Sequence, residues 1–212
     1  MGKNLPIRSS RRRELIEATI SIIARHGYSG TTVSRVAKAA GVSVGLMNFH
    51  FESKDKLFKE TFKYLADDYH QLWLTRIAGC STDPWDRLRT MIGAYFDPEV
   101  FTSEKLAVWF SFWSDAALRD NFRNAAARVE HRYIRDLEGE IYRLVMHRPE
   151  AKKTAMRITG ALSAMIDGYW LQALLAPRTF KSKDAVRSCI AFLEICALYY
   201  EGKTVSKAAK AE

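Results

Sequence analysis

The chain has 212 residues, enough for one large domain or two small ones. Hydrophobic residues make up 48% and charged residues 27%, which is ordinary for a soluble globular protein and excludes a wholly disordered chain. The net charge of +9 favours a polyanionic partner. Residues 1–60 hold 11 basic and 5 acidic side chains, so the first quarter of the chain is where a nucleic-acid contact is expected.

The cysteine content and the apolar segments indicate a cytoplasmic protein with no membrane partner. Cys80, Cys189 and Cys196 are odd in number and lack CxxC spacing, which favours free thiols in a reducing compartment. The beginning of the chain lacks the apolar core of a signal peptide. Residues 158–177 carry one charge, Asp167, but also several polar residues, so we interpret the segment as a buried or interface helix.

Helical periodicity extends over most of the chain. Residues 122–144 show the pattern clearly, with apolar positions spaced three and four apart, and no period-two strand with a hairpin turn is found. We therefore predict an all-α fold with a loose basic arm over residues 1–8, continued by Arg11, Arg12 and Arg13. The predicted helices cover 9–26, 33–40, 43–50, 54–79, 85–96, 103–117, 121–146, 151–175 and 182–200.

The segment from residue 31 to residue 51 predicts two short helices joined by a tight turn. Thr31 or Thr32 can cap the first helix. Gly41 stands where a helix ends in a left-handed residue, and Ser43 can cap the next helix two residues later. This is the arrangement of a helix-turn-helix unit, in which the second helix enters the major groove of DNA. An unremarkable helical hairpin is the alternative.

The second of these helices has two distinct faces. Met47 and Phe51 are four residues apart and are expected to point into the domain core. The side chains expected to point outward are then Val44, Gly45, Asn48 and Phe49.

The helix-turn-helix segment and its flanking residues resemble the TetR family of one-component transcriptional repressors. The residues that carry the resemblance are Gly27-Tyr28, Thr31-Thr32, Val36-Ala37, Ala40 to Ser43, Gly45, His50-Phe51, Ser53-Lys54 and Leu57-Phe58. It implies an N-terminal three-helix DNA-binding unit, a connecting helix and a helical effector domain that dimerises. We place the DNA-binding domain at residues 1–53, the effector and dimerisation domain at 54–200, and a flexible tail at 201–212.

The resemblance implies which residues meet DNA. Base-edge and groove positions correspond to Val44, Gly45, Asn48 and Phe49, whereas Thr32, Ser43, His50 and Lys54 correspond to positions that touch phosphate or cap nearby helices. Asn48 departs from the family, which usually has Tyr there, and an Asn can instead contact an adenine edge bidentately. His50 can also be structural. For Arg11 to Arg13 two interpretations are open: they contact the DNA backbone or minor groove, or they only form the solvated beginning of a helix.

Aromatic residues are dense in the effector segment. Trp109, Phe112 and Trp113 are spaced to share one helix face, and Trp170 follows Asp167 by one turn with Tyr169 beside it. Aromatic faces attract organic cations, and a carboxylate in an apolar segment favours a cationic ligand. These six residues predict a cage for a small organic cation, such as a quaternary amine. Core packing is the alternative explanation of the aromatic stripe.

The same segments resemble those of BetI-type regulators, TetR-family repressors of genes that convert choline to glycine betaine. The matching stretches are 109–113 and 164–171, together with 11–19 and 95–97. This implies choline or a related amine as the effector. The alternative effectors are another amine, a lipophilic drug or an acyl ligand. A further alternative is a DNA-binding protein that has no effector.

The helices 151–175 and 182–200 carry more apolar surface than a solvated helix would. Two such helices from each of two chains would form a four-helix homodimer interface, as the family implies. A two-fold dimer would bind the two half-sites of a pseudo-palindromic double-stranded operator.

Enzymatic function is not expected. The sequence has no HExxH, GxSxG, Walker or GxGxxG motif, and Asp67-x-x-His70 lacks the second pair that a helical dimetal site needs. We predict no catalytic residues, no cofactor and no metal.

Overall fold

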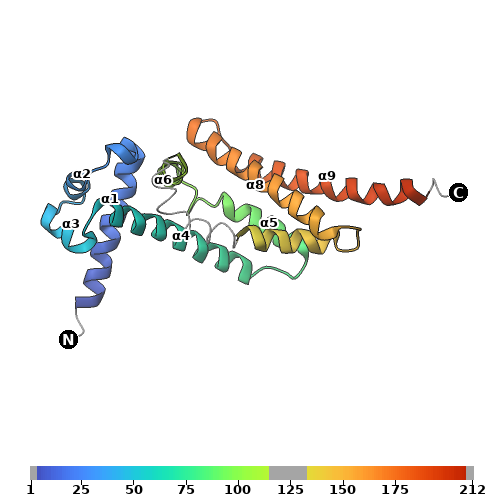
Figure 1. Ribbon diagram of the computed structural model, residues 1–212, viewed down its shortest axis with the longest axis horizontal. Coiled ribbons are helices and arrows are strands. Elements are labelled where there is room, and N and C mark those ends of the chain that lie inside the picture. The colour runs from blue at the N-terminus through green and yellow to red at the C-terminus, as the bar shows by residue number, and fades with distance from the viewer. Residues whose placement is uncertain (1–3, 115–132, 209–212) are drawn as a thin grey trace. The chain divides into compact units, whose positions relative to one another are not determined.

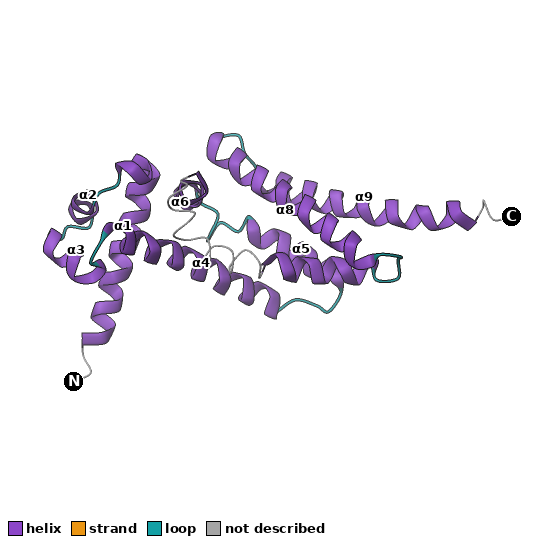
Figure 2. Ribbon diagram, in the orientation of Figure 1, coloured by secondary structure: helices purple, strands orange, loops and turns teal. Residues whose placement is uncertain are grey.

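The computed structural model describes the backbone of residues 4–114 and 133–208, and that part of the chain is built from helices and loops, as predicted (Figures 1 and 2). The chain divides by packing into two compact units. The first contains residues 1–70 and 99–126, and the second contains residues 71–98 and 127–212.

The first unit contains α1 (Asn4–Gly30), α2 (Val33–Ala39), α3 (Val44–Phe51), the first part of α4 (Lys54–Ala78) and α6 (Ser103–Ser114). α1 is kinked at Gly27, whose φ of 66° ends the regular helix and is a conformation that glycine adopts without strain. The buried Thr31 hydroxyl donates to the Gly27 carbonyl at 2.7 Å and stabilises the turn that follows.

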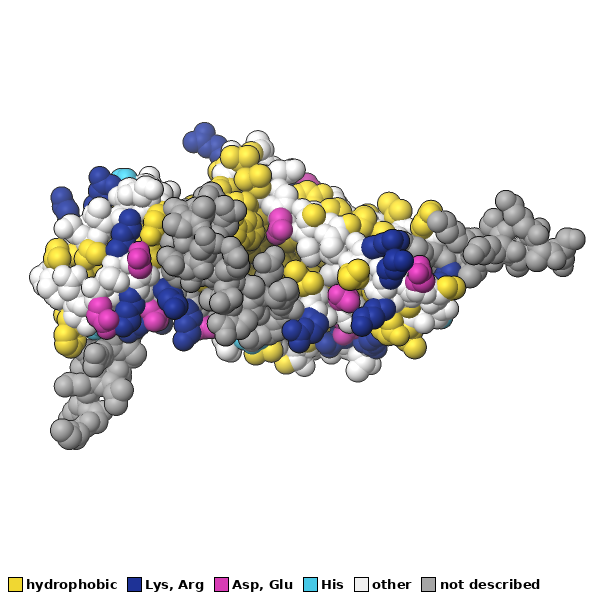
Figure 3. Space-filling model, viewed as in Figure 1, with side chains coloured by type: hydrophobic (Ala, Val, Ile, Leu, Met, Phe, Trp, Pro, Cys, Tyr) yellow, Lys and Arg dark blue, Asp and Glu magenta, His cyan; other side chains and the backbone are white. Residues whose placement is uncertain are grey.

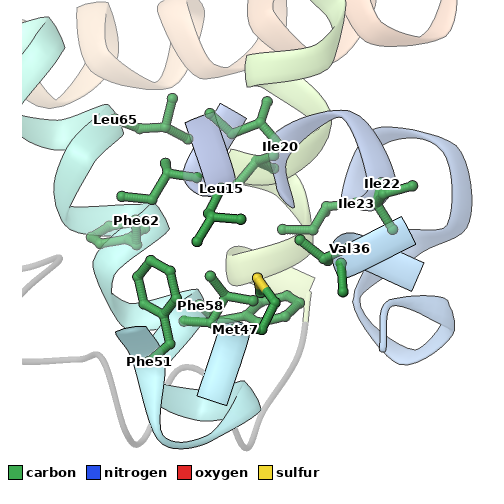
Figure 4. Close-up of a cluster of buried hydrophobic side chains, with 14 of the residues drawn as sticks. Leu15, Ile20, Ile22, Ile23, Val36, Met47, Phe51, Phe58, Phe62 and Leu65 are labelled. Atoms are coloured by element: carbon green, nitrogen blue, oxygen red, sulfur yellow. The ribbon is translucent and has the colours of Figure 1, made fainter. Parts of the chain in front are cut away.

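The core of the first unit is one cluster of apolar side chains to which all five helices contribute. Figure 4 shows Leu15 of α1, Met47 of α3 and Phe58 of α4 pointing toward a common centre. From α6, Val108 and Phe112 complete the cluster. α6, which follows the predicted DNA-binding domain by some fifty residues in the sequence, therefore packs directly with the helices of that domain.

The second unit contains the end of α4, α5 (Pro84–Tyr95), a helix over 133–145, α8 (Ala151–Leu175) and α9 (Ser182–Ala208). α5 begins with Asp83 as N-cap, whose carboxylate accepts from the Asp86 amide at 3.0 Å, and with proline as its first residue. The core residues with little or no exposed area include Leu88, Ile92 and Leu137.

An ionic network joins two helices of the second unit. Glu140 is buried and accepts from Arg87 at 2.5 Å and from Arg143 at 2.6 Å. Arg143 also donates to the Thr82 carbonyl at 2.6 Å in the loop before α5. Removing the carboxylate would take away the acceptor of the partly buried Arg87 guanidinium and break its link with Arg143, so Glu140 holds α5 and the 133–145 helix together.

Several predicted boundaries differ from the observed ones. α1 begins at Asn4, before the predicted start at residue 9, and α9 ends at Ala208, after the predicted end at residue 200. Extending an existing helix needs no new nucleation, so a helix can continue beyond the last position that apolar periodicity marks. The predicted helix over 121–146 is observed from 133 to 145, and residues 115–132 lie outside the described residues.

Among the described helices none is long and apolar enough to cross a membrane.

Candidate nucleic-acid interface and effector segment

The turn between α2 and α3 is fixed by local hydrogen bonds. Gly41 is left-handed, with φ of 64°. Its amide donates to the Lys38 carbonyl at 3.2 Å, and the amide of Val42 donates to the Ala37 carbonyl at 2.9 Å. This pair of bonds is the Schellman arrangement, which satisfies the last carbonyls of a helix and requires a residue that tolerates positive φ. The predicted left-handed glycine is confirmed.

Both helices are capped by hydroxyl side chains. Thr32 Oγ1 accepts from the Arg35 amide and Ser43 Oγ accepts from the Leu46 amide, each at 3.2 Å. Thr32 is therefore the cap of α2, while Thr31 bonds backward to the α1 kink. Thr32 and Ser43 are both exposed, and each lies at a helix N-terminus where backbone amides and the helix dipole favour a phosphate.

The two faces of α3 are those that the sequence predicts. Met47 and Phe51 are 1% and 2% exposed. The predicted outward residues Val44, Gly45, Asn48 and Phe49 are all exposed. His50 is half-buried, and its ring lies edge-on to the Phe49 ring with centroids 5.4 Å apart.

Lys54 is engaged with α1 at the beginning of α4. Its ammonium donates to the Tyr28 carbonyl at 3.1 Å and lies 4.4 Å from the centre of the Tyr28 ring. The Phe58 ring is 5.4 Å from the same nitrogen and packs edge-on against Tyr28. The side chain is half-buried in this position. Of the two roles implied for Lys54, these contacts favour a structural one, fastening α4 to the kinked end of α1.

The basic run at the beginning of α1 is ion-paired. Arg11 and Arg13 pair with Glu14 and Glu17 on their own helix, at 2.6 Å and 3.4 Å. Arg12 pairs with Glu60 of α4 at 3.0 Å, and its guanidinium also lies 5.0 Å from the centre of the Phe51 ring. Arg12 thus connects three helices of the unit.

The first three residues of the predicted cation cage lie on α6 in the first unit. Phe112 is buried and Trp109 is half-buried, and their rings lie edge-on to Phe62 of α4 at centroid distances of 4.7 Å and 4.9 Å. Trp113 is half-buried and packs against Phe110 at 4.9 Å. Phe112 is thus a core residue of the unit that contains the helix-turn-helix.

The other three lie on α8 in the second unit. Trp170 is buried and its indole N–H donates to the Tyr95 carbonyl at 3.2 Å. Its ring lies edge-on to the Tyr95 ring, with centroids 6.4 Å apart. Tyr169 is half-buried beside Phe96, at a centroid distance of 6.3 Å. Asp167 is exposed in the single chain. The prediction of a cation cage assumed a carboxylate buried among apolar residues, and this assumption is wrong for the protomer.

A surface cavity that the sequence did not predict lies where α8 turns into α9. It has a volume of about 350 Å³ and is lined by Tyr169, Phe180, Gln172 and Asp184, among others. Asp184 is ion-paired with Arg187. Of the predicted ligand residues, only Tyr169 borders this cavity. Its lining extends from Tyr169 to Ser188 and comes from the end of α8, the connecting loop and the beginning of α9, which no sequence motif marks.

Within the described residues, no three His, Cys, Asp or Glu side chains are grouped as a metal site would require.

Comparison with known proteins agrees with this architecture. Residues 15–61 match the family of bacterial regulatory proteins of the tetR family, and residues 84–197 match the C-terminal domain of BetI-type transcriptional repressors. The HTH-type transcriptional regulator BetI of Paraburkholderia xenovorans is 30% identical over 191 residues, which cover 90% of this chain and 95% of that protein. The chain belongs to the TetR family of DNA-binding transcriptional regulators, with a C-terminal domain of the BetI type, and not to a family of enzymes.

Solved structures share the fold. A transcriptional regulator from Pseudomonas aeruginosa PAO1 superposes with a TM-score of 0.74 at 29% identity, covering 90% of this chain and 91% of that one. A regulator from Saccharomonospora viridis, solved in complex with choline, has a TM-score of 0.70 at 20% identity, covering 88% of this chain and 96% of that one.

Proposed function

We propose that this protein is a homodimeric repressor that binds a pseudo-palindromic operator through α3 and is released from it by choline or a related quaternary amine. The outward face of α3 is the observation that carries the proposal. Its exposed side chains form a face distinct from the buried one of Met47 and Phe51, as a helix inserted into the major groove requires. Val44, Gly45, Asn48 and Phe49 would meet the bases, and Thr32, Ser43 and His50 would lie beside the phosphates.

Cations on α2 support the same interface. Arg35 and Lys38 are exposed on the helix that precedes α3, and both are absent from the set predicted from the sequence. Arg35 also donates to the Gly30 carbonyl, which restrains its side chain near the beginning of α2. Neutralising phosphates releases counterions and supplies most of the non-specific affinity of DNA-binding proteins. We assign phosphate contacts to these two residues.

Exposed apolar residues on α8 and α9 support the homodimer. Leu175 is 75% exposed, and Ile195 and Leu198 are each 65% exposed. Hydrophobic side chains are visible along both helices in Figure 3. On α8 the exposed positions Gly160, Ala164 and Gly168 follow each other every four residues, so small side chains form a stripe on one face. A second chain could approach closely along this stripe, and TetR-family regulators usually form dimers.

The choline proposal is supported by the BetI-type C-terminal domain and by the choline complex of the relative with the same fold. On α8, exposed Asp167 and half-buried Tyr169 would contact the cation, because buried Trp170 is engaged in the core. On α6, Phe112 is a core residue of the first unit, and half-buried Trp109 and Trp113 are the remaining candidates there. Cation binding would favour a dimer whose α3 helices no longer match the half-site spacing. Another amine, a lipophilic drug or an acyl ligand is the alternative effector.

The test is a gel-shift titration with DNA from upstream of the protein's own gene, at fixed salt, with and without choline. We expect a specific complex that choline dissociates. Asp167→Asn should weaken the choline response, whereas the matched control Asp67→Asn, an exposed carboxylate on α4, should keep it. Both substitutions raise the net charge equally, so a general electrostatic effect cancels. A specific complex that ignores choline would remove the effector proposal and keep the repressor.

A further inference from the structure

The exposed face of α3 carries two large apolar side chains. Phe49 is 64% exposed and lies on the side of the helix opposite Met47, and Val44, one turn before Met47, is 42% exposed at the edge of the exposed face. Asn48 is exposed on the same side and supplies the one side-chain amide of the helix. Apolar side chains at exposed positions of a DNA-contacting helix have a specific complement in the major groove, the methyl group of thymine. An Asn amide has another, the N6 and N7 edge of adenine.

Arg and Lys, the side chains that most often recognise guanine, are absent from this helix. Between Lys38 and Lys54 the sequence contains no Lys or Arg. Arg or Lys bonded to the O6 and N7 of guanine is the commonest base-specific contact, and α3 has no side chain that makes it. Lys54, the next cation along the chain, donates to the Tyr28 carbonyl and lies over the Tyr28 ring.

Gly45 gives an independent indication that the backbone of α3 approaches DNA closely. A Cβ atom at this position would lie 3.8 Å from Ser43 Oγ, an ordinary contact, and the residue is helical rather than left-handed. Alanine would therefore fit the fold, and it is the better helix former. The fold does not require glycine here, and a close surface outside the protomer would account for it.

We propose that the base pairs beneath α3 in each operator half-site are A·T pairs. Val44 and Phe49 contact thymine methyl groups, Asn48 binds an adenine edge, and Gly45 allows the helix to lie deep in the groove. This inference rests on the proposed function, because it specifies the DNA that the same interface recognises.

The test begins with the full-length protein and a pool of duplexes with randomised sequence. Enriched duplexes are expected to contain two half-sites whose central positions are A·T. Each thymine of the enriched half-site is then replaced singly by deoxyuridine, which removes only the methyl group. Replacement beneath α3 should weaken binding about fourfold, the effect of withdrawing one buried methyl-sized group. Replacement outside the half-site should leave affinity unchanged.

Protein variants assign each contact. In Val44→Ala or Phe49→Ala, one of the deoxyuridine effects should disappear. Asn48→Ala should abolish discrimination at one adenine, where wild-type protein loses about tenfold or more in affinity on exchange to G·C. Met146→Ala removes an equally exposed apolar side chain from the second unit and should change none of these values. Gly45→Ala should raise the melting temperature and yet weaken operator binding.

The outcomes separate this inference from the proposed function. Enriched half-sites with guanine beneath α3, or thymines there that tolerate deoxyuridine, would overturn the A·T assignment and keep the repressor. Gly45→Ala with unchanged operator affinity would overturn the close approach of the backbone. A protein that enriches no sequence at all would contradict the proposed function itself.

Discussion

Replacing Lys54 with Met separates a structural role of this residue from a phosphate contact. Met keeps the unbranched stem and removes the ammonium, which is 3.1 Å from the Tyr28 carbonyl and 4.4 Å from the centre of the Tyr28 ring. A hydrogen bond from a charged donor contributes about 1.5–3 kcal/mol and an exposed cation–π contact about 0.5–1 kcal/mol. Because Lys54 is only half-buried, we expect the free energy of unfolding to fall by about 2 kcal/mol.

Two measurements on Lys54→Met distinguish the roles. Urea unfolding gives the stability change, and operator affinity at several salt concentrations gives the dependence of log K on log salt. Each phosphate contact contributes about 0.9 to that slope. We expect lower stability and an unchanged slope. Lys38→Met is the control, since Lys38 is exposed on α2, and it should leave stability unchanged and reduce the slope by about 0.9 per protomer.

The structural role of Lys54 would be refuted by the opposite pair of results. If Lys54→Met unfolds at the same urea concentration as wild type and its salt slope falls as it does for Lys38→Met, the ammonium binds phosphate instead of fastening α4 to α1.

Other substitutions test the fold around the two sites. Gly41→Ala should cost about 1–2 kcal/mol from left-handed strain alone, since a Cβ there meets no neighbour; an unchanged thermal unfolding midpoint would contradict the Schellman turn. Ser43→Ala should cost about 1 kcal/mol through loss of the α3 cap, measured by urea unfolding, and no loss would mean that the cap is not formed in solution. Trp170→Phe should lower stability by about 1–3 kcal/mol, because the Tyr95 carbonyl loses its donor; a variant as stable as wild type in urea would argue against that bond. Burial raises the pKa of the Cys189 thiol to about 11 from 9.0, so its contribution to stability is complete below pH 9 and is lost as the pH rises toward 11. Native Cys189 should therefore resist alkylation at pH 8, and rapid labelling would contradict its burial.

The helix-turn-helix could be predicted from the sequence because its determinants are local. The Gly41 turn and the Ser43 cap depend on residues within five positions of each other, and helical periodicity alone places Met47 and Phe51 on one face. Each of these features is fixed by backbone geometry and nearby hydrogen bonds. The structure confirms all of them.

Burial and long-range contacts were decided only by the tertiary structure. Lys54 meets a carbonyl 26 residues away, α6 completes the core of the first unit, and Asp167 is exposed although its sequence neighbours are apolar. The indole N–H of Trp170 donates a hydrogen bond to the carbonyl of Tyr95, 75 residues away. Periodicity tells which residues share a helix face, but the environment of that face depends on which distant helix packs against it. The sequence therefore determined the DNA-binding element and its exposed side chains, and the packing of the helices determined which aromatic residues belong to the core.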